Sequence, residues 1–394
     1  SRAHPSPGEA RPGRYSVGMP QDPMISALGA VIRLDTEALT PEDRDALHRV
    51  WADAAAAPSS EADDVVPFSG GQEIEHLLST ASQKVTRAAI KARRGELWML
   101  HAGAVADEQG RVVVVIGPSG RGKTTATRTL AQRYAYVSDE TVAIDSDGIV
   151  HPYRKPLSII EDEQRVKAQR PPSELGLGAL PAVPLRLAAL VLLDRRPDGP
   201  DKAVIEDCNV GDVLDEVVQQ TSYFADLPHP LRTLAAHAEA VGGFRRAIYR
   251  EAEALADAFA PLFRDPATNV IAEEHVALAP ASRSGAAEGW QRTPYLDALA
   301  LTDPSRIAIV QSGEAGGLLR IIDGIGPVLW QHADGRPLAE LVSAVVAAHG
   351  EPGSDDAAQL VDVAIAELAE QGLLTSAAET GFDPTETRYQ AGAS

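Results

Sequence analysis

The residues best suited to chemistry form a glycine-rich run in the first third of the chain. Gly117-Pro118-Ser119-Gly120-Arg121-Gly122-Lys123-Thr124 fits the pattern G-x-x-x-x-G-K-[ST], between a Val-rich apolar run and a segment of helical character. Glycines let successive backbone N–H groups turn inward around a phosphate, and a helix that follows directs its positive end at the same point. The run therefore predicts a P-loop that binds a nucleoside triphosphate.

Side chains in and near this run have predicted roles toward the nucleotide. Lys123 is expected to neutralise the terminal phosphates, and the hydroxyl of Thr124 is expected to bind Mg²⁺. Thr125 follows Thr124 directly and is also predicted to bind the nucleotide. Lys155, in the segment HPYRKPLS, is a further candidate for phosphate contact, although an exposed loop charge is an equally simple interpretation.

Two further features flank the P-loop. His101 follows the apolar residues WML just before the P-loop strand, and Asp139-Glu140 close the short strand YAYVS after it. A carboxylate at the end of a neighbouring strand is where a P-loop fold holds Mg²⁺ or its waters, and a second one beside it can accept a proton from an attacking hydroxyl. For His101 an ordinary strand-end hydrogen bond stays open as the alternative.

These motifs resemble those of a known protein family. The run LHAGAVADEQGRVVVVIGPSGRGKTTATRTLAQRYAYVSDETVAIDSDGIVHPYRKPLSI resembles the core of the HPr kinase/phosphorylase family and its relatives that phosphorylate modified peptides. The resemblance covers about residues 97–160 and fades to a pattern of elements out to about 263. It implies ATP and Mg²⁺ as cofactors, Asp139 as the base for a substrate hydroxyl with His101 in support, and Glu140 and Thr124 as metal ligands. The pair is Asp-Glu where the family usually has Asp-Asp, so the division of roles between the two stays open.

The surrounding pattern predicts an α/β fold, a P-loop kinase core of the HPr kinase type with helices around a mainly β core. Residues 112–116 are five consecutive apolar residues and predict a strand that is buried on both faces. Further strands are expected at 27–34, 97–106, 134–145 and 187–193. Helices are expected at 41–55, 73–94, 124–133, 213–220, 231–240 and 245–263, and the basic residues of 73–94 are interpreted as a solvated face. Residues 1–24 are expected to be a disordered tail, and 25–278 the P-loop domain.

A second domain is predicted at 295–377, after a small, polar linker at 279–294 and before a tail at 378–394. Its pattern is two paired strands, 306–310 and 317–322, and then helices at 326–332, 337–349 and 355–371, a winged-helix-like α+β arrangement. The third helix is expected to bury Leu360, Ala364, Ile365 and Leu368 and to end at Gly372.

This second domain resembles the PqqD-like domains that bind leader peptides in ribosomal peptide modification. The matching stretches are GIGPVLWQHADGRPLAELVSAVVAAHG and DDAAQLVDVAIAELAEQGLL. The resemblance implies capture of an extended peptide as an added strand at a sheet edge. Residues 301–370 contain 11 acids and three bases, which argues against a DNA-binding winged helix. A structural or dimerising appendage stays open.

The composition of the chain limits its possible binding partners and its location. The 394 residues include 36 Lys and Arg against 56 Asp and Glu, so the net charge of −20 disfavours binding to nucleic acid or to an anionic membrane surface. The single cysteine, Cys208, excludes a disulfide framework, and no apolar run approaches the ~18 residues of a membrane span. A cytoplasmic location is expected.

Together these features predict an ATP-dependent kinase acting on a Ser or Thr of a peptide or small protein, with a ribosomal precursor peptide as one candidate. A small-molecule kinase on the same core, or a nucleotide-gated peptide-binding scaffold, stays open, as does a homo-oligomer.

Overall fold

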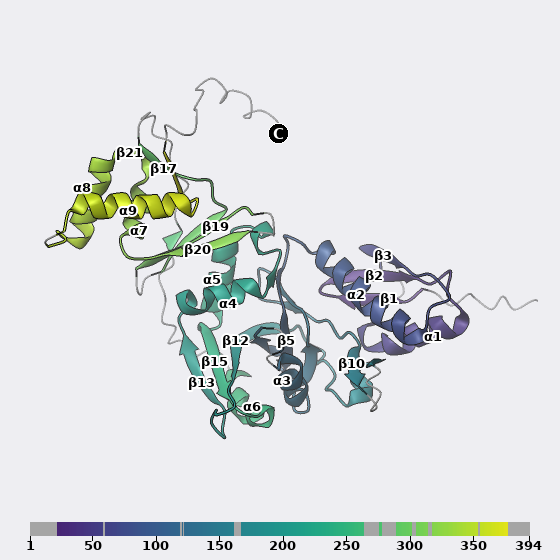
Figure 1. The fold of residues 1–394 in the computed structure, drawn as a ribbon. Helices are drawn as coiled ribbons and strands as arrows, with labels where there is room; N and C mark the ends of the chain where they lie inside the picture. The colour runs from purple at the N-terminus through teal and green to yellow at the C-terminus, as the bar shows by residue number, and fades with distance from the viewer. Residues whose placement is uncertain are drawn as a thin grey trace, which may run out of the picture.

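The chain is a mixed α/β protein in which three units follow one another in sequence (Figure 1). The computed structural model describes residues 22–376 except 58–59, 119, 121, 161–166, 264–275, 278–288, 302–304, 314–316 and 354. The predicted tails lie outside these residues, apart from Asp22, Pro23 and Met24 at the start, and so does most of the predicted linker. Among the described residues, no helix combines the length and the apolar character that crossing a membrane requires.

The N-terminal unit is a three-stranded sheet covered by two helices. The sheet has the order β1-β2-β3, with β1 antiparallel and β3 parallel to β2. Its elements are β1 (Met24–Ala27), β2 (Ala30–Asp35), α1 (Pro41–Val50), β3 (Asp64–Pro67) and α2 (Ile74–Ala92).

The strand predicted at 27–34 is confirmed over residues 30–34, which lie in β2, but not at its start, where the chain turns back at Leu28 and Gly29. Leu28 and Gly29 have φ of 55° and 77°, and the turn pairs Ile25 with Ile32. Two successive residues with positive φ are typical of tight hairpin turns, where Asn or Gly usually stands first. Leu28 is fully buried, so its side chain packs in the core while its backbone makes the turn. Because an apolar residue stands where a turn residue is usual, the sequence did not indicate the turn.

The start of α1 was predicted correctly, and its end was not. Thr40 caps the helix, since its Oγ1 accepts a hydrogen bond from the N–H of Asp43 at 3.2 Å, and Pro41 is the first helical residue. The α-helix ends at Val50 rather than near residue 55, and a 3₁₀ turn at Ala52–Ala54 follows it.

The central unit is built on a six-stranded sheet with the order β13-β15-β12-β6-β5-β7, beside a four-stranded sheet β14-β4-β8-β9 and a hairpin β10-β11. Its strands are β4 (Trp98–Leu100), β5 (Ala102–Ala106), β6 (Arg111–Ile116), β7 (Ala135–Ser138), β8 (Val142–Ile144), β9 (Val150–His151), β10 (Leu157–Ile160), β11 (Lys167–Arg170), β12 (Arg186–Arg195), β13 (Val204–Cys208), β14 (Thr221–Ser222) and β15 (Phe244–Tyr249). Its helices are α3 (Lys123–Leu130), α4 (Val210–Gln219), α5 (Pro230–Ala240) and α6 (Leu255–Phe259).

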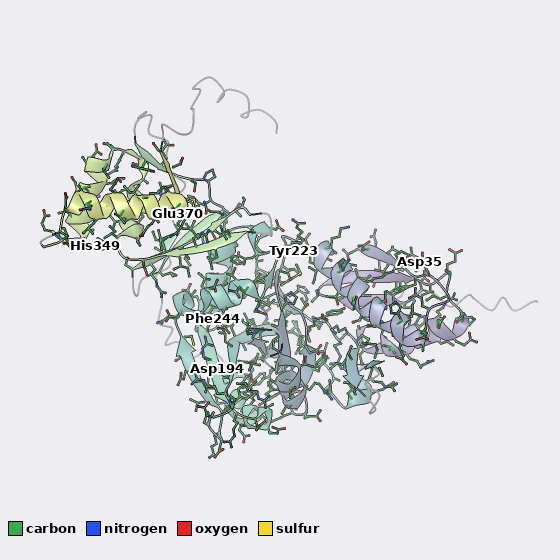
Figure 2. The ribbon with its side chains drawn as sticks, in the orientation of Figure 1. Asp35, Asp194, Tyr223, Phe244, His349 and Glu370 are labelled. Carbon is green, nitrogen blue, oxygen red and sulfur yellow. The ribbon has the colours of Figure 1, made fainter. Side chains whose placement is uncertain are left out.

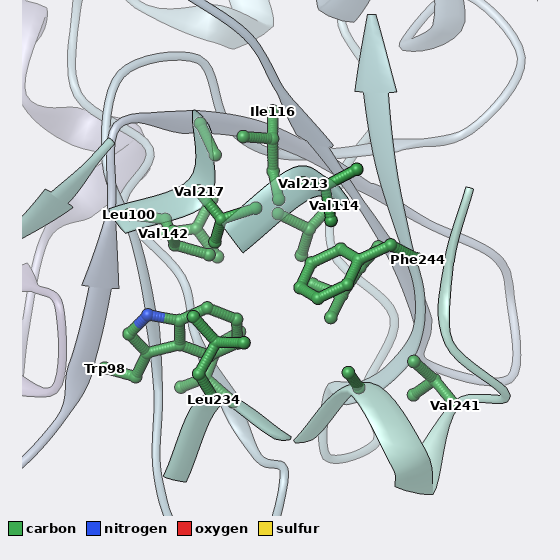
Figure 3. Packing of buried hydrophobic residues seen from close by; sticks show 14 of the residues in the cluster. Trp98, Leu100, Val114, Ile116, Val142, Val213, Val217, Leu234, Val241 and Phe244 are labelled. Carbon is green, nitrogen blue, oxygen red and sulfur yellow. The ribbon is translucent and has the colours of Figure 1, made fainter. Parts of the chain in front are cut away.

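Strand β6 is buried on both faces, as its run of valines predicts. It runs parallel to β12 and antiparallel to β5. Val114 and Ile116 pack on one side among residues of α4 and α5 and against Phe244 (Figure 3), whereas Val113 and Val115 pack on the other side with residues of α3. Two layers of helices therefore enclose the strand that leads into the glycine-rich loop.

The helix predicted at 245–263 was wrong at its beginning. Residues 244–249 form β15, which lies between β12 and β13 and pairs with both. Only the Ala- and Glu-rich part that follows forms helical turns, α6 and the 3₁₀ turns on either side of it. Pairing with two neighbouring strands outweighs local propensity here, because it satisfies the backbone groups on both edges of β15.

The C-terminal unit contains a sheet of order β16-β18-β19-β20, a small sheet β21-β17-β22 and three helices. Its elements are β16 (Val276–Ala277), β17 (Trp290–Arg292), β18 (Asp297–Leu301), β19 (Arg306–Gln311), β20 (Leu318–Ile322), α7 (Gly326–His332), β21 (Asp334–Arg336), α8 (Leu338–His349), α9 (Ala357–Glu370) and β22 (Leu374–Ser376). The pairing of β19 with β20 and the three helices agree with the predicted pattern.

One face of α9 differs from its prediction. Ile365 and Leu368 are buried as expected, and Gly372 has φ of 73° just beyond the helix. Leu360, however, is 44% exposed, and its neighbour Val361 takes the buried position. Val361, Ile365 and Leu368 follow the i, i+4, i+7 spacing of one helix face, whereas Leu360 lies one position off it.

The sheet β16-β18-β19-β20 packs on the central unit as well as on its own helices. Leu299 and Val310 belong to the central apolar core, while Ile307 and Ile309 face the helices α7 to α9. Of the predicted linker, residues 290–292 form strand β17. The division of the chain into domains stays a prediction, and apolar packing crosses the proposed boundary.

An ion pair with a buried carboxylate joins the two units across this contact. Asp297 of β18, whose side chain is 2% exposed, accepts hydrogen bonds from the N–H and the Nε of Arg232 in α5 at 3.1 and 3.0 Å. Arg133 and Asp257 form a comparable pair at 2.9 Å, but that carboxylate is 97% exposed.

Removing the buried carboxylate should therefore destabilise the chain far more than removing the exposed one. We expect Asp297→Ala to lower the free energy of unfolding by about 1–3 kcal/mol, since charge-assisted hydrogen bonds to a buried group are lost. Asp257→Ala should change it by less than about 0.5 kcal/mol. Urea titrations of both variants measure the difference, and equal effects would contradict a tight contact between the units.

Candidate active site

The glycine-rich loop follows β6 and opens into a cavity of about 780 Å³. Gly120 and Gly122 have φ of 79° and 88°, a conformation that glycine adopts without strain. Gly122 precedes α3, whose first residue is Lys123. The backbone N–H groups at the start of this helix and the loop therefore offer donors to an anion, as a P-loop requires. Ser119 and Arg121 lie outside the described residues.

Residues from both sides of the glycine-rich loop line the same cavity. The predicted site residues along it are His101, Gly120, Gly122, Lys123, Thr124, Thr125, Asp139, Glu140 and Lys155. Gly117 and Pro118 lead into the loop, and the carbonyl of Gly117 accepts a hydrogen bond from Lys123 Nζ at 2.5 Å. Burial lowers the pKa of Lys123, which marks its ammonium as a partly desolvated charge.

The acidic pair sits in the turn between β7 and β8, with its two carboxylates in different environments. Asp139 is 9% exposed and accepts a hydrogen bond from the hydroxyl of Tyr136 at 2.8 Å. Glu140 is half-exposed and forms an ion pair with Lys155 at 2.9 Å. Ser138 fixes the turn, since its Oγ donates to the carbonyl of Thr141 at 2.7 Å. The buried carboxylate is thus held by a neutral donor, and the exposed one by a cation.

Lys155 lies inside the cavity rather than on an exposed loop. Its side chain is 11% exposed. Burial lowers the pKa of this ammonium, but the charges of Asp139 and Glu140 and the hydrogen bond with Glu140 outweigh burial and raise it overall. Lys155 therefore adds a second ammonium group to the cavity that Lys123 lines, where it can meet an anionic ligand.

The neighbouring Arg154 has a structural role. It is buried and its Nη1 donates to the carbonyl oxygens of Tyr136 and Gly178. Its guanidinium also lies over the ring of Tyr136, 5.6 Å from the ring centroid. Arg154 thus supports the residue that donates to Asp139.

His101 is an exposed residue at the junction of β4 and β5. Its N–H donates to the carbonyl of Gln220 at 2.7 Å, which ties the turn to the residue after α4. The imidazole lines the cavity together with Asp139. His101 therefore lines the same cavity as Asp139 and Glu140.

Three residues of the site were not predicted. Ser158 and Gln220 line the cavity, and Tyr136 holds Asp139. Tyr136 lies in the run YAYVSDE, three residues before Asp139. The sequence could therefore have predicted that the two residues lie close together. Ser158 and Gln220 carry no local motif, because they reach the cavity only through the packing of β10 and α4.

The donor set fits a magnesium ion bound together with phosphates. Thr124, Asp139 and Glu140 all line the cavity and have oxygen-bearing side chains, and Mg²⁺ is commonly held by one or two carboxylates plus substrate phosphates. Among the described residues, no three His, Cys, Asp or Glu side chains gather into a site that could hold a metal alone. A metal here would therefore depend on the nucleotide for part of its ligands.

Comparisons with known proteins give little further information. No protein-family model matches the sequence, and no curated protein matches it. Among solved structures, the Hpr(Ser) kinase/phosphatase from Coxiella burnetii aligns over 42% of this chain and 92% of its own, with 13% identity and a TM-score of 0.24. A TM-score this low leaves the function to be argued from the residues of the site.

The pKa values of the two cavity lysines should be shifted in opposite directions. The sequence contains six lysines, so lysine-selective ¹³C labelling gives few enough NMR signals to follow each with pH. We expect the pKa of Lys123 to lie below that of exposed lysines because burial disfavours its charge, and the pKa of Lys155 to lie above it because of the two carboxylates.

Glu140→Gln serves as the diagnostic variant. It should lower the pKa of Lys155 and leave the pKa of Lys123 in place, because only Lys155 is paired with Glu140. If Lys123 and Lys155 both had the same pKa as the exposed lysines, that result would contradict the described geometry.

Proposed function

We propose that the chain is an ATP-dependent kinase that transfers the γ-phosphate to a Ser or Thr hydroxyl of a peptide or small protein. One observation carries the proposal: a buried carboxylate, Asp139, shares a single cavity with the P-loop lysine, Lys123. A carboxylate at this place can hold Mg²⁺ or accept a proton, and transfer to a hydroxyl needs such an acceptor for its proton.

The proposed mechanism is mainly positional and electrostatic. Lys123, the N–H groups of the loop and Lys155 together offset the charge of the phosphates. Mg²⁺, when bound by Thr124 and Glu140, would supply further charge neutralisation at the phosphates. Asp139 Oδ2 remains available to receive the hydroxyl proton, since its Oδ1 accepts from Tyr136. His101 lies at the same cavity and is proposed to orient the acceptor group.

A peptide or protein acceptor is favoured by the C-terminal unit. Strand β20 is the last strand of its sheet among the described strands, so one of its edges is left for a further strand. From Pro337 to Ser376 the sequence carries seven acids and no Lys or Arg, and a nucleic-acid backbone would be repelled there. We therefore propose that β20 and the helices behind it hold the substrate chain.

The P-loop lysine should be essential for transfer and dispensable for folding. Lys123→Ala is expected to lower phosphoryl transfer by about 10²–10³-fold, the usual loss for one preorganised electrostatic contact. Lys202→Ala, at an exposed position before β13, is the matched control and should retain full activity. Transfer of labelled phosphate from ATP to protein substrates measures the effect, with circular dichroism to show that both variants fold. Wild-type activity in Lys123→Ala would place the chemistry elsewhere.

The acidic pair should separate the proton acceptor from the metal ligand. Asp139→Asn keeps the shape and the hydrogen bond with Tyr136 but cannot take a proton, so kcat should fall by about 10²–10⁴-fold while nucleotide affinity changes only a few-fold. Glu140→Gln should instead raise the Mg²⁺ concentration needed for half-maximal activity. His101→Ala should fall between wild type and Asp139→Asn.

Single-turnover transfer and nucleotide binding, measured on the same variants, decide the assignment. Full activity of Asp139→Asn at raised Mg²⁺ would show that Asp139 is a metal ligand only. Full activity of all three variants would remove the basis of the kinase proposal.

A further inference from the structure

Lys155 reaches the cavity at the P-loop from a segment without regular secondary structure. Residues 152–156 join β9 to β10 and have the sequence Pro-Tyr-Arg-Lys-Pro. Because these five residues belong to no helix or strand, other contacts must fix the backbone from which Lys155 pairs with Glu140 at 2.9 Å. The contacts of this segment therefore decide where the charge of Lys155 lies.

Tyr153, two residues before Lys155, anchors the segment in the N-terminal unit. Its side chain is fully buried and belongs to the apolar core that the N-terminal unit mainly forms. The ring stacks on the indole of Trp51, just after α1, with 6.5 Å between the ring centroids and 27° between the ring planes. A residue of the central unit is thus packed inside its neighbour.

The hydroxyl of Tyr153 adds a directed bond to this packing. Its oxygen lies 2.7 Å from Thr86 Oγ1 in α2. Thr86 has one hydroxyl proton, which it donates to the carbonyl of Ser82 at 2.9 Å, so Tyr153 is the donor to Thr86. Loss of this acceptor would leave a polar group of a buried residue without its partner, which is costly.

Successive residues carry this anchorage to the active site. The N–H of Tyr153 donates to the carbonyl of Val137 in β7 at 3.1 Å. Arg154 donates to a further carbonyl of β7, and Lys155 pairs with Glu140. Residues 153–155 thus bind, between them, the N-terminal unit, the strand that leads to the acidic pair, and the acidic pair itself.

The N-terminal unit contacts the central unit at other points as well. Asp53, in the 3₁₀ turn after α1, accepts a hydrogen bond from the N–H of Ser173 at 2.6 Å. Side chains fill the space between the two units (Figure 2), where Asp35 marks the N-terminal unit and Asp194 the central one. The unit that holds Tyr153 is therefore itself fixed against the central unit.

We propose that Tyr153 is a positioning residue of the nucleotide site: held by Thr86 and Trp51, it keeps the ammonium of Lys155 at the cavity. This inference rests on the proposed function, in which Lys155 meets the phosphates of ATP. Tyr153 is not among the residues that line the cavity, so it acts through Lys155. The N-terminal unit lies before residue 97, where the resemblance to the kinase family begins, and it becomes part of the nucleotide site by this contact.

A positioning role makes the effect of Tyr153 depend on Lys155. A residue that places one charged group has nothing left to contribute when that group is removed, so the effects of the two substitutions should not add. A residue that only stabilises the fold would weaken nucleotide binding equally with and without Lys155.

The test is a double-mutant cycle on the full chain, read by the affinity for the fluorescent nucleotide mant-ATP with Mg²⁺. Lys155→Ala should weaken binding by about 10- to 100-fold, the range for a hydrogen bond to a charged group. Tyr153→Phe and Thr86→Val keep the shape but remove the anchoring bond, and each should weaken binding by about three- to tenfold. When Lys155 is alanine, neither should change the affinity by more than about twofold.

Two substitutions of the same kind are matched controls. Thr80→Val changes another partly exposed threonine of α2, and Tyr134→Phe removes a hydroxyl that donates to the carbonyl of Ala256 at 3.3 Å. Neither should alter the affinity for mant-ATP, with or without Lys155. Circular dichroism shows that each variant folds, and Thr86→Val carries the cycle if Tyr153→Phe does not fold.

Transfer of labelled phosphate from ATP, measured on the same variants, separates the inference from the proposed function. Weaker binding in Tyr153→Phe and Thr86→Val that disappears without Lys155 supports the inference, and the absence of any transfer would then contradict the kinase proposal alone. Equal weakening with and without Lys155, or unchanged affinity in both variants, overturns the inference, and transfer by the wild-type chain would leave the kinase proposal standing. Failure of the wild-type chain to bind mant-ATP overturns both.

Discussion

The candidate site depends on the pairing of β6 with its two neighbours. In the antiparallel register with β5, Ala102 faces Ile116, so the residue before Ala102, His101, lies beside Gly117 at the start of the loop. Strand β7 pairs with the far side of β5 and runs in the same direction as β6, so its end, and with it Asp139, reaches the same edge. Segments far apart in the sequence thus meet because three strand ends coincide.

An irregularity in the pairing of β5 with β7 lies next to the acidic pair and affects its orientation. Between β5 and β7 the register moves from Ala104 opposite Ser138 to Val105 opposite Tyr136, which leaves Val137 as an extra residue. A bulge of this kind bends a strand and redirects its side chains, and bulges are frequent next to functional sites. Here it accompanies the contact in which Tyr136 donates to Asp139, three residues later. The bulge follows from the pairing of two strands and has no signature of its own in the sequence.

This geometry explains what the sequence could and could not reveal. The loop, the strand before it and the acidic turn were predictable, because each is a local pattern of residue types with a physical requirement behind it. The hairpin at Leu28 and the strand at 244–249 were not, because a buried leucine replaces the usual turn residue in one case and pairing on both edges overrides propensity in the other. Gln220 and Ser158 were missed for a third reason: only the packing of distant elements brings them to the cavity.

The same reasoning explains the position of Gln220 at the cavity. Strand β14 pairs with β4, which places Thr221 opposite Leu100 and Ser222 opposite Met99, and so fixes residues 220–222 against the strand that ends at His101. The indole of Trp98 adds a hydrogen bond to Thr221 Oγ1 at 3.2 Å, and that hydroxyl in turn donates to the carbonyl of Val217. Backbone pairing and side-chain hydrogen bonds thus hold residues 220–222 firmly beside His101. The position of Gln220 at the cavity is therefore set by the fold and not by a flexible loop.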